Sequence, residues 1–148
     1  RLPNLAVVGA ADGDWLAGFS NRSRHHVDLI AQGTRVLGRV GPEAFERMSG
    51  TSMAAAAVSN AIARCLAVYP ELTPEQVLLI LQSTAQQNDA DYWLSFSRST
   101  GPIDVQRATQ MAAVFRMSDA GLGPDGIANR LDLDTEFVLR AQALRTTL

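Results

Sequence analysis

The sequence predicts an α/β domain followed by a small all-helical appendix. Three observations predict this order: short apolar, β-prone runs in the first 40 residues, an alanine-rich stretch without Gly or Pro over 52–69, and helical patterns alone after residue 103. The chain has 148 residues, of which 47% are hydrophobic, so a sizeable core can be buried. We place the α/β part at residues 1–108 and the helical appendix at residues 109–148.

Three strands are expected before the alanine-rich stretch. The run NLAVVGAA (4–11) is apolar and is followed by the turn sequence DGD, which is typical of a strand buried on both faces of a parallel sheet. Residues 26–31 and 34–40 are two further strand candidates, separated by a short turn. Residues 40–47 have the composition of a polar loop.

Two helices are expected next. Alanine dominates the stretch 52–69, so this helix carries small side chains on most faces; we expect it to be buried and closely approached by its neighbours. The following helix, within residues 70–85, has Thr73 as a suitable N-cap and Pro74 at its first position. Residues 86–102 are then expected to form a loop.

The C-terminal part of the sequence predicts three more helices, at 103–121, 123–131 and 134–145. Gly121 is suited to end the first of them, because glycine tolerates the left-handed conformation that often follows a helix. Asp132 or Asp134 is expected to cap the last helix.

Composition and charge exclude several classes of protein. The formal net charge of −2 provides no basic field for nucleic acid, and the scattered carboxylates form no dense oxygen-ligand loop, so neither a metal nor a cofactor is predicted. The single cysteine, Cys65, cannot form an internal disulfide and is expected to be a small buried hydrophobe. No apolar run reaches the ~18 residues of a membrane helix, so no membrane is expected as a partner.

The start of the chain carries no targeting information. It has neither an initial Met nor the charged leader and apolar block of a signal peptide, and it begins abruptly inside what reads as a strand. We therefore expect a piece of a longer or processed protein, and the sequence leaves its localisation open.

The stretch RMSGTSMAAAAV (47–58) holds a serine in a glycine-threonine turn directly before the alanine-rich helix. A serine hydroxyl is a weak nucleophile until a base takes its proton and donors stabilise the resulting oxyanion. The first N–H groups of a helix have no intrahelical partner and carry the positive end of the dipole, so Ser52 is placed where such donors are available. Gly50 is expected to allow a backbone conformation that a Cβ would forbid and to leave space for a substrate. The alternative interpretation is that Thr51 or Ser52 is a simple N-cap.

The segment GTSMAA (50–55) matches, letter for letter, the motif that holds the nucleophile in the subtilisin-like serine proteases (subtilases), and the chain resembles that family. Residues 4–38 are similar to the family's stretch before the nucleophile, with a Phe-Ser-Asn segment, a Val-Asp pair and an Ala-x-Gly turn in order. Residues 69–85 resemble the helix after the nucleophile helix, and TGPIDVQRA (100–108) resembles the closing segment of the domain. The similarity implies the C-terminal portion of a subtilisin-like parallel-sheet domain.

The resemblance implies that Ser52 is the nucleophile and that its backbone N–H is one donor of the oxyanion hole. Gly50, Thr51 and Met53 complete the turn, with Met53 at the leaving-group side of the cleft. The implied reaction is hydrolysis of a polypeptide substrate through an acyl-enzyme. In the family, the catalytic Asp and His and the oxyanion Asn precede the serine by many tens of residues, whereas 51 residues precede Ser52 here. An upstream portion of the protease, from the same precursor or a separate chain, is therefore the expected partner, and this chain alone is expected to be inactive.

The other candidate catalytic side chains in the sequence are expected to be structural. His25 and His26 lie in a polar segment beside two arginines, as exposed loop residues do. Asp12, Asp14 and Asp28 are expected at turns or strand ends rather than in a catalytic triad.

The chain departs from the family pattern in two places. Ala56-Ala57 stands where Pro-His is usual, and Gln32 replaces the proline of the Ala-Pro-Gly turn. Neither change removes a reacting group. They leave open an alternative function, an inactive pseudoprotease that serves as a binding or regulatory module.

The helical appendix resembles a helix-turn-helix unit, which raises DNA as a second alternative partner. Residues 104–148 contain six acidic and five basic residues, and the expected recognition helix contributes Arg140 and Arg145 with two acids at its start. A packing or protein-interaction unit is therefore favoured, and nucleic acid is not an expected partner.

Overall fold

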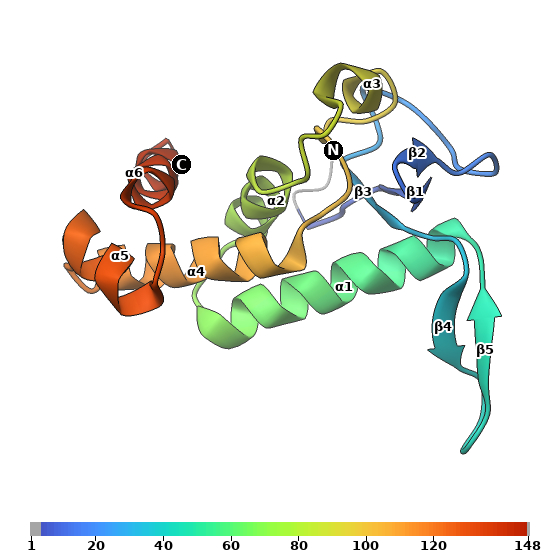
Figure 1. Ribbon diagram of the computed structural model, residues 1–148, viewed down its shortest axis with the longest axis horizontal. Helices are drawn as coiled ribbons and strands as arrows, with labels where there is room; N and C mark the ends of the chain where they lie inside the picture. The colour runs from blue at the N-terminus through green and yellow to red at the C-terminus, as the bar shows by residue number, and fades with distance from the viewer. Residues whose placement is uncertain (1–3, 148) are drawn as a thin grey trace.

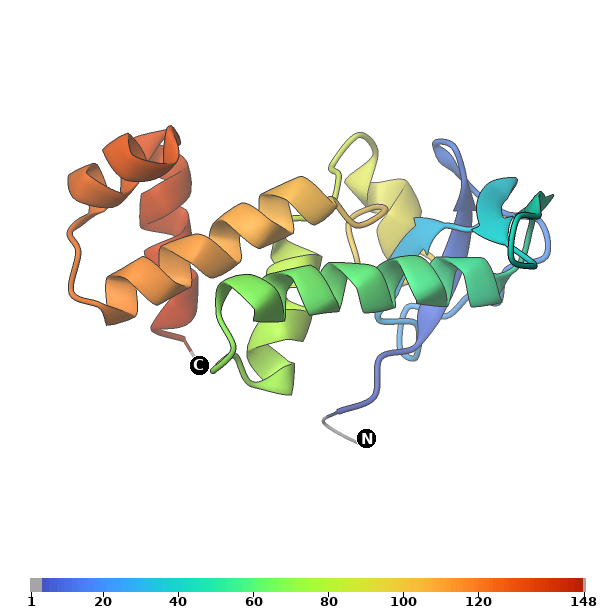
Figure 2. The ribbon, with the colours of Figure 1, turned by 90° about the horizontal axis from the view of Figure 1, so that it is seen from below.

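A computed structural model describes residues 4–147 as an elongated molecule (Figures 1 and 2). The sheet and a β-hairpin lie at one end, the long helices α1 and α4 run side by side through the middle, and α5 and α6 form the other end. The elements in chain order are β1 (Val8–Asp12), β2 (Trp15–Leu16), β3 (Leu29–Gln32), β4 (Val36–Arg39), β5 (Phe45–Met48), α1 (Thr51–Val68), α2 (Pro74–Ser83), α3 (Ala90–Leu94), α4 (Val105–Asp119), α5 (Pro124–Leu131) and α6 (Thr135–Arg145).

The main sheet has the strand order β2-β1-β3. Strands β1 and β3 pair in parallel, from Val8 opposite Leu29 to Ala11 opposite Gln32, which confirms the parallel sheet expected from the apolar run 4–11. Strand β2 folds back on β1 as a short antiparallel partner. The inner residues of β1 and β3 are fully buried, because helix α1 covers one face of this sheet.

The strand predicted at 34–40 belongs to a different sheet. It forms β4 and pairs antiparallel with β5 in a two-stranded hairpin that projects beyond the start of α1 (Figure 1). The prediction of a loop over 40–47 is therefore wrong in its second half. The segment 45–48 lacks the alternation of a half-buried strand, and its extended shape comes from pairing with β4 across the turn, where the Val40 N–H donates to the Ala44 carbonyl at 2.9 Å.

Helix α1 forms where the alanine-rich stretch predicts it, one residue earlier at each end. Its buried residues, Ala54, Val58, Ala61 and Cys65, form one stripe that faces the sheet and α4. The expectation that this helix is buried is wrong for residues 4–147, since four of its 18 residues are buried. The expectation that no segment suits a membrane is also wrong by length and composition, because the 18 residues of α1 have a mean hydropathy of 1.3. Core helices of other proteins pass the same test, so length and composition alone do not place α1 in a membrane. Within residues 4–147, α1 packs against the sheet and α4 along one stripe, and 22% of the window is buried.

Helix α2 begins with the capping box that Thr73 predicts. The Thr73 hydroxyl accepts from the Gln76 N–H at 3.2 Å, and the Gln76 side chain accepts from the Thr73 N–H at 2.9 Å. The predicted loop 86–102 contains the short helix α3, which begins at the cap Asp89. The helix is held by its buried residue Trp93, a tertiary contact that local sequence signals do not show.

Helix α4 begins at the cap Asp104 and is continuous across the predicted boundary at 108/109. Its buried residues, Phe115 among them, share one core with the domain helices and with Val138 of α6. Gly121 follows the helix end with φ of 83°, as predicted, and Asp134 is the residue that caps α6. Residues 1–3 and 148 of the two predicted units lie outside the described part of the chain.

Candidate active site

Ser52 lies in the first turn of α1, and its side chain is exposed to solvent. Among residues 4–147, no donor or acceptor forms a hydrogen bond with its hydroxyl. The hydroxyl is not the helix cap either, since the N-cap is Gly50 and no side chain caps the helix. The simple N-cap interpretation therefore does not describe Ser52, and its oxygen is available to an incoming group.

The turn before Ser52 is fastened to the loop after β3. The Gly50 N–H donates to the Gly33 carbonyl at 2.8 Å, and the Arg35 N–H donates to the Ser49 hydroxyl at 2.9 Å. Gly33 is closely packed, because a Cβ placed on it would lie 2.6 Å from the Ala10 Cβ and 2.9 Å from the Gly50 carbonyl oxygen. The end of the parallel sheet and the start of α1 thus meet with backbone against backbone, which holds the serine-bearing turn in place.

Gly50 itself does not need to be glycine on conformational grounds. Its φ is 163°, which is extended backbone, and a Cβ there would make ordinary contacts of 3.5 Å with the Met53 sulfur and 3.8 Å with the Ser52 nitrogen. The expectation that a Cβ would be forbidden at Gly50 is therefore wrong within this chain. The steric restriction lies at Gly33, on the opposite side of the same hydrogen bond.

The first N–H groups of α1 are available as donors. The Met53 and Ala54 N–H groups donate to the Gly50 carbonyl at 3.1 and 3.4 Å, while within residues 4–147 nothing accepts from the N–H of Thr51 or Ser52. The first turn contains no acidic residue, so the positive end of the helix dipole is not neutralised locally. This arrangement can stabilise negative charge that develops beside the Ser52 hydroxyl.

The structure brings none of the sequence's other titratable candidates into hydrogen-bond contact with Ser52 among the described residues. His25 and His26 are exposed as expected, and His26 Nδ1 lies 3.0 Å from the Ser23 hydroxyl in a local turn. Asp12 is exposed and accepts from the Thr34 hydroxyl at 2.6 Å.

Two further groups are structural. Asp28 is fully buried and accepts from the Val7 N–H at 2.9 Å, so it joins the starts of β1 and β3. Cys65 is fully buried within the core stripe of α1, and burial raises the pKa of its thiol to about 11. A thiol with such a pKa is almost entirely protonated at neutral pH, which makes Cys65 unsuitable as a nucleophile.

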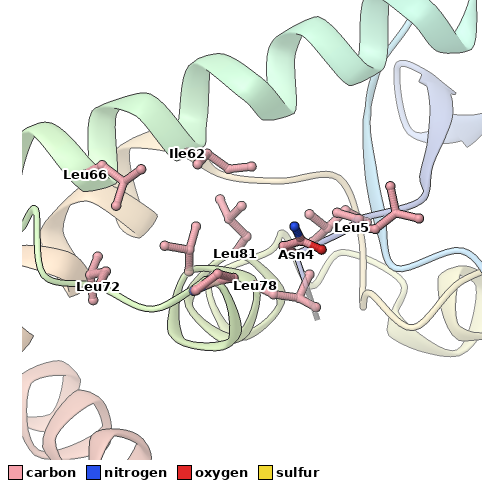
Figure 3. A pocket seen from close by; sticks show the side chains of 11 residues that line it. Asn4, Leu5, Ile62, Leu66, Leu72, Leu78 and Leu81 are labelled. Atoms are coloured by element: carbon pink, nitrogen blue, oxygen red, sulfur yellow. The ribbon is translucent and has the colours of Figure 1, made fainter. Parts of the chain in front are cut away.

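A cavity of about 250 Å³ lies away from the serine, between α1, α2 and the segment before β1 (Figure 3). Side chains from Ile62 and Leu66 of α1 face those of Leu78 and Leu81 of α2 across it. Its lining is apolar apart from Asn4, and it offers no acid, base or nucleophile. The full lining is Asn4, Leu5, Ala6, Leu29, Ile62, Leu66, Leu72, Pro74, Val77, Leu78 and Leu81.

Sequence reasoning missed the residues that hold the serine-bearing turn. Arg35 adopts φ of 50°, which is uncommon for a residue with a side chain, and its carbonyl accepts from the Arg47 guanidinium at 3.0 Å. Ser49 and Gly33 complete this arrangement from the two adjoining segments. No local signal marks Arg35, because its partners Arg47 and Ser49 reach it only when the β4–β5 hairpin forms.

The chain belongs to the subtilase family, since the family's sequence model matches residues 1–116. It is 32% identical to subtilisin DY of Bacillus licheniformis over 110 residues, which cover 74% of this chain and 39% of that protein. It is also 30% identical to a probable subtilase-type serine protease of Deinococcus radiodurans, over 92% of this chain and 21% of the relative. The second alignment extends into the helical appendix. The chain thus spans less than half the length of each of these curated relatives.

Solved structures show the same fold. Fervidolysin from Fervidobacterium pennivorans, described as a keratinolytic enzyme related to subtilisin, matches with a TM-score of 0.61 and 26% identity, over 73% of this chain and 19% of that one. The self-cleaved protease domain of PatA matches with a TM-score of 0.58 and 28% identity, over 75% and 42% of the two chains. The maturation protease PagA, at 24% identity and a TM-score of 0.60 over 74% and 42% of the chains, shares the fold. Family and neighbours together support a serine-protease-like function.

Proposed function

We propose that this chain carries the nucleophile of a serine endopeptidase, with Ser52 as the attacking residue and Gly50, Thr51 and Met53 as the turn around it. The observation that carries the proposal is the exposed Ser52 hydroxyl in the first turn of α1, beside two backbone N–H groups that have no acceptor among the described residues. The subtilase membership of residues 1–116 supports it.

The proposed reaction follows from the chemistry of these groups. The Ser52 oxygen attacks the carbonyl carbon of a peptide bond, a histidine base takes the hydroxyl proton, and the carbonyl oxygen becomes an oxyanion beside the Ser52 N–H. The carbon–nitrogen bond then breaks, and the leaving amine receives the proton from the base. Water hydrolyses the remaining ester and frees Ser52.

The base, its orienting aspartate and the second oxyanion donor are proposed to come from an upstream portion of the protease, in the same precursor or a separate chain. Two observations support this partner. Helix α1 has a mean hydropathy of 1.3, yet four of its 18 residues are buried, so an apolar helix is left mostly uncovered by residues 4–147. The chain also spans 39% of subtilisin DY, which leaves ample length for the remaining parts in a protein of that size.

Labelling with a fluorophosphonate tests the proposal, because this reagent modifies a serine only when its hydroxyl is activated. The protein is assembled with its upstream portion and compared with the Ser52→Ala and Ser59→Ala variants. Ser59 is the matched control: it is exposed on the same helix, and its hydroxyl donates to the Ala55 carbonyl at 3.0 Å. Labelling is expected in the assembled protein and in Ser59→Ala, and is expected to be lost in Ser52→Ala. The 148-residue chain alone is expected to show neither labelling nor peptide hydrolysis.

Absence of labelling in a folded, complete assembly would contradict the proposal and favour the pseudoprotease alternative. The structure offers little support for DNA as the partner of such a module. Arg140 pairs with Glu136 at 3.3 Å on the exposed face of α6, and Arg145 pairs with Asp119 of α4, so both cations of the expected recognition helix have acidic neighbours.

A further inference from the structure

The β4–β5 hairpin has two faces of different character. Directly opposite residues of an antiparallel pair lie on the same face, and successive residues of a strand alternate between faces. The register pairs Leu37 with Arg47 and Arg39 with Phe45, so these four residues share one face, which we name the outer hairpin face. All four are exposed, with Leu37 at 60% and Phe45 at 61%.

The opposite face is more enclosed. Val36 and Met48 are half-buried there, and Met48 lies so close over Gly38 that a Cβ on this glycine would be 2.5 Å from the Met48 methyl carbon. Glu46 is on this face as well, opposite Gly38. The outer hairpin face therefore carries large apolar groups that the hairpin's own packing does not use.

The two cations of the outer hairpin face are held in place without being neutralised. Arg39 donates to the carbonyls of Gly41 and Pro42, and Arg47 donates to the carbonyl of Arg35 at 3.0 Å. Within residues 4–147, neither guanidinium forms an ion pair with a carboxylate. A guanidinium has five N–H donors, so each retains donors for an external acceptor after these bonds.

We propose that the outer hairpin face binds an acidic segment of a polypeptide substrate, one that carries carboxylates next to large apolar side chains. The charge is complementary, because the face has two cations and no acid. The checkerboard of two arginines and two apolar groups suits side chains of both kinds in one extended peptide. Arginine and aromatic side chains, phenylalanine included, are also enriched in protein interfaces relative to the rest of the surface.

The position of the hairpin connects this surface with the nucleophile. Arg47 precedes Ser52 by five residues, which an extended chain spans in at most about 18 Å. Figure 1 shows the hairpin projecting from the body at the end where α1 begins. A polypeptide bound at Ser52 can therefore extend onto the hairpin. The inference rests on the proposed function in this respect, since the bound segment is part of a substrate.

Peptide binding to the assembled Ser52→Ala protein tests the proposal without cleavage. Fluorescence anisotropy compares a labelled peptide in which Glu and Phe take turns at every second position, with Ser between them, with the same peptide carrying Lys in place of Glu. This spacing puts the Glu and Phe side chains on the same face of an extended peptide. The acidic peptide is expected to bind at least about tenfold more tightly, and its affinity is expected to fall about tenfold in Arg39→Glu and in Phe45→Ser. Glu46→Gln, on the opposite face, is the matched control and is expected to leave the affinity unchanged.

Several outcomes overturn the proposal. Equal binding of the acidic and basic peptides would overturn it. A loss of affinity for the acidic peptide in Arg39→Glu but not in Phe45→Ser would also overturn it, because the surface would then bind through its charge alone. A Leu37→Cys variant that resists maleimide in the folded assembly would show that another part of the protein covers the face. Fluorophosphonate labelling separates this inference from the proposed function. Labelling of Ser52 without a preference for the acidic peptide would contradict peptide binding by the hairpin and leave the proposed protease function standing. Peptide preference without labelling removes the proposed protease and, with it, the assignment of the bound segment to a substrate.

Discussion

Replacement of Gly33 by alanine tests whether close backbone packing holds the serine-bearing turn. The added Cβ would lie 2.6 Å from the Ala10 Cβ and 2.9 Å from the Gly50 carbonyl oxygen, where unstrained carbon–carbon contacts are about 3.5–4.0 Å. Neither neighbour is the flexible end of a long side chain. Strand β1 or the turn before Ser52 must therefore move, by about 1 Å if one of them takes the whole shift.

The expected cost has two parts. Overpacking of a close-packed site costs about 1–3 kcal/mol, and weakening the 2.8 Å hydrogen bond between the Gly50 N–H and the Gly33 carbonyl costs about 1 kcal/mol more. A displacement of about 1 Å at a reacting group can lower the rate about a hundredfold. Gly33→Ala is therefore expected to lower the free energy of unfolding by about 2–4 kcal/mol and to slow the labelling of Ser52 by more than its loss of stability explains.

Two measurements check this prediction. Guanidinium unfolding followed by the fluorescence of the buried Trp93 reports stability, and the rate of fluorophosphonate labelling in the assembled protein reports the position of Ser52. Gly18→Ala is the control, because a Cβ there meets no heavy atom within 4 Å. It is expected to stay within about 0.5 kcal/mol of the unchanged protein. Gly33→Ala with unchanged stability and an unchanged labelling rate would refute the packing argument.

Three further predictions concern the core and the joint between domain and appendix. Val138→Ala is expected to lower the unfolding free energy of the whole chain by about 2 kcal/mol in a single transition, since Val138 is fully buried in the shared core. Leu139 is 50% exposed, so Leu139→Ala is the control and is expected to have little effect. Two separate unfolding transitions would show that the appendix folds independently. Burial raises the pKa of Cys65 from 9.0 to about 11, so the folded state disfavours the thiolate. The free energy of unfolding is therefore expected to stay constant below pH 9 and to fall as the pH rises toward 11. In a series of unfolding curves at different pH values, Cys65→Ala is expected to flatten this dependence. The hydrogen bond to Asp119, together with burial, raises the pKa of Tyr69, and Asp119→Asn is expected to bring that pKa back toward 10.0 in a spectrophotometric titration; an unchanged value would mean that the 2.6 Å contact is absent in solution.

Much of the fold could be predicted because its signals are local. The capping box at Thr73, the left-handed glycine at Gly121 and the cap Asp134 depend on neighbours within four residues, which the sequence displays directly. The parallel pairing of β1 with β3 could be expected from the apolar character of the first strand, since a continuous apolar run is typical of strands in parallel sheets covered by helices. Ser52 could be named as a candidate nucleophile because a motif of six consecutive residues marks it, and that role stays a prediction.

The sequence-based predictions are wrong where contacts between distant parts of the chain determine the secondary structure or the burial of a segment. Residues 45–48 become a strand only because β4 lies beside them, and residues 90–94 become a helix around the buried Trp93. Helix α1 has the composition of a buried helix, but the number of its faces that are covered depends on what packs against it. Composition reports what a segment can tolerate, and the neighbours determine its actual burial.

The sequence by itself determined the order of the main elements and the family, and it marked Ser52 as the candidate nucleophile, because periodicity, caps and the GTSMAA motif are properties of adjacent residues. Only the tertiary structure decided which glycine is sterically required and how the serine-bearing turn is fastened. Gly33, Arg35 and Ser49 are separated along the chain by up to 16 positions and interact across a hairpin that exists only in the folded state. Hydrogen bonds and close contacts of this kind depend on distances in space, which spacing along a sequence does not encode.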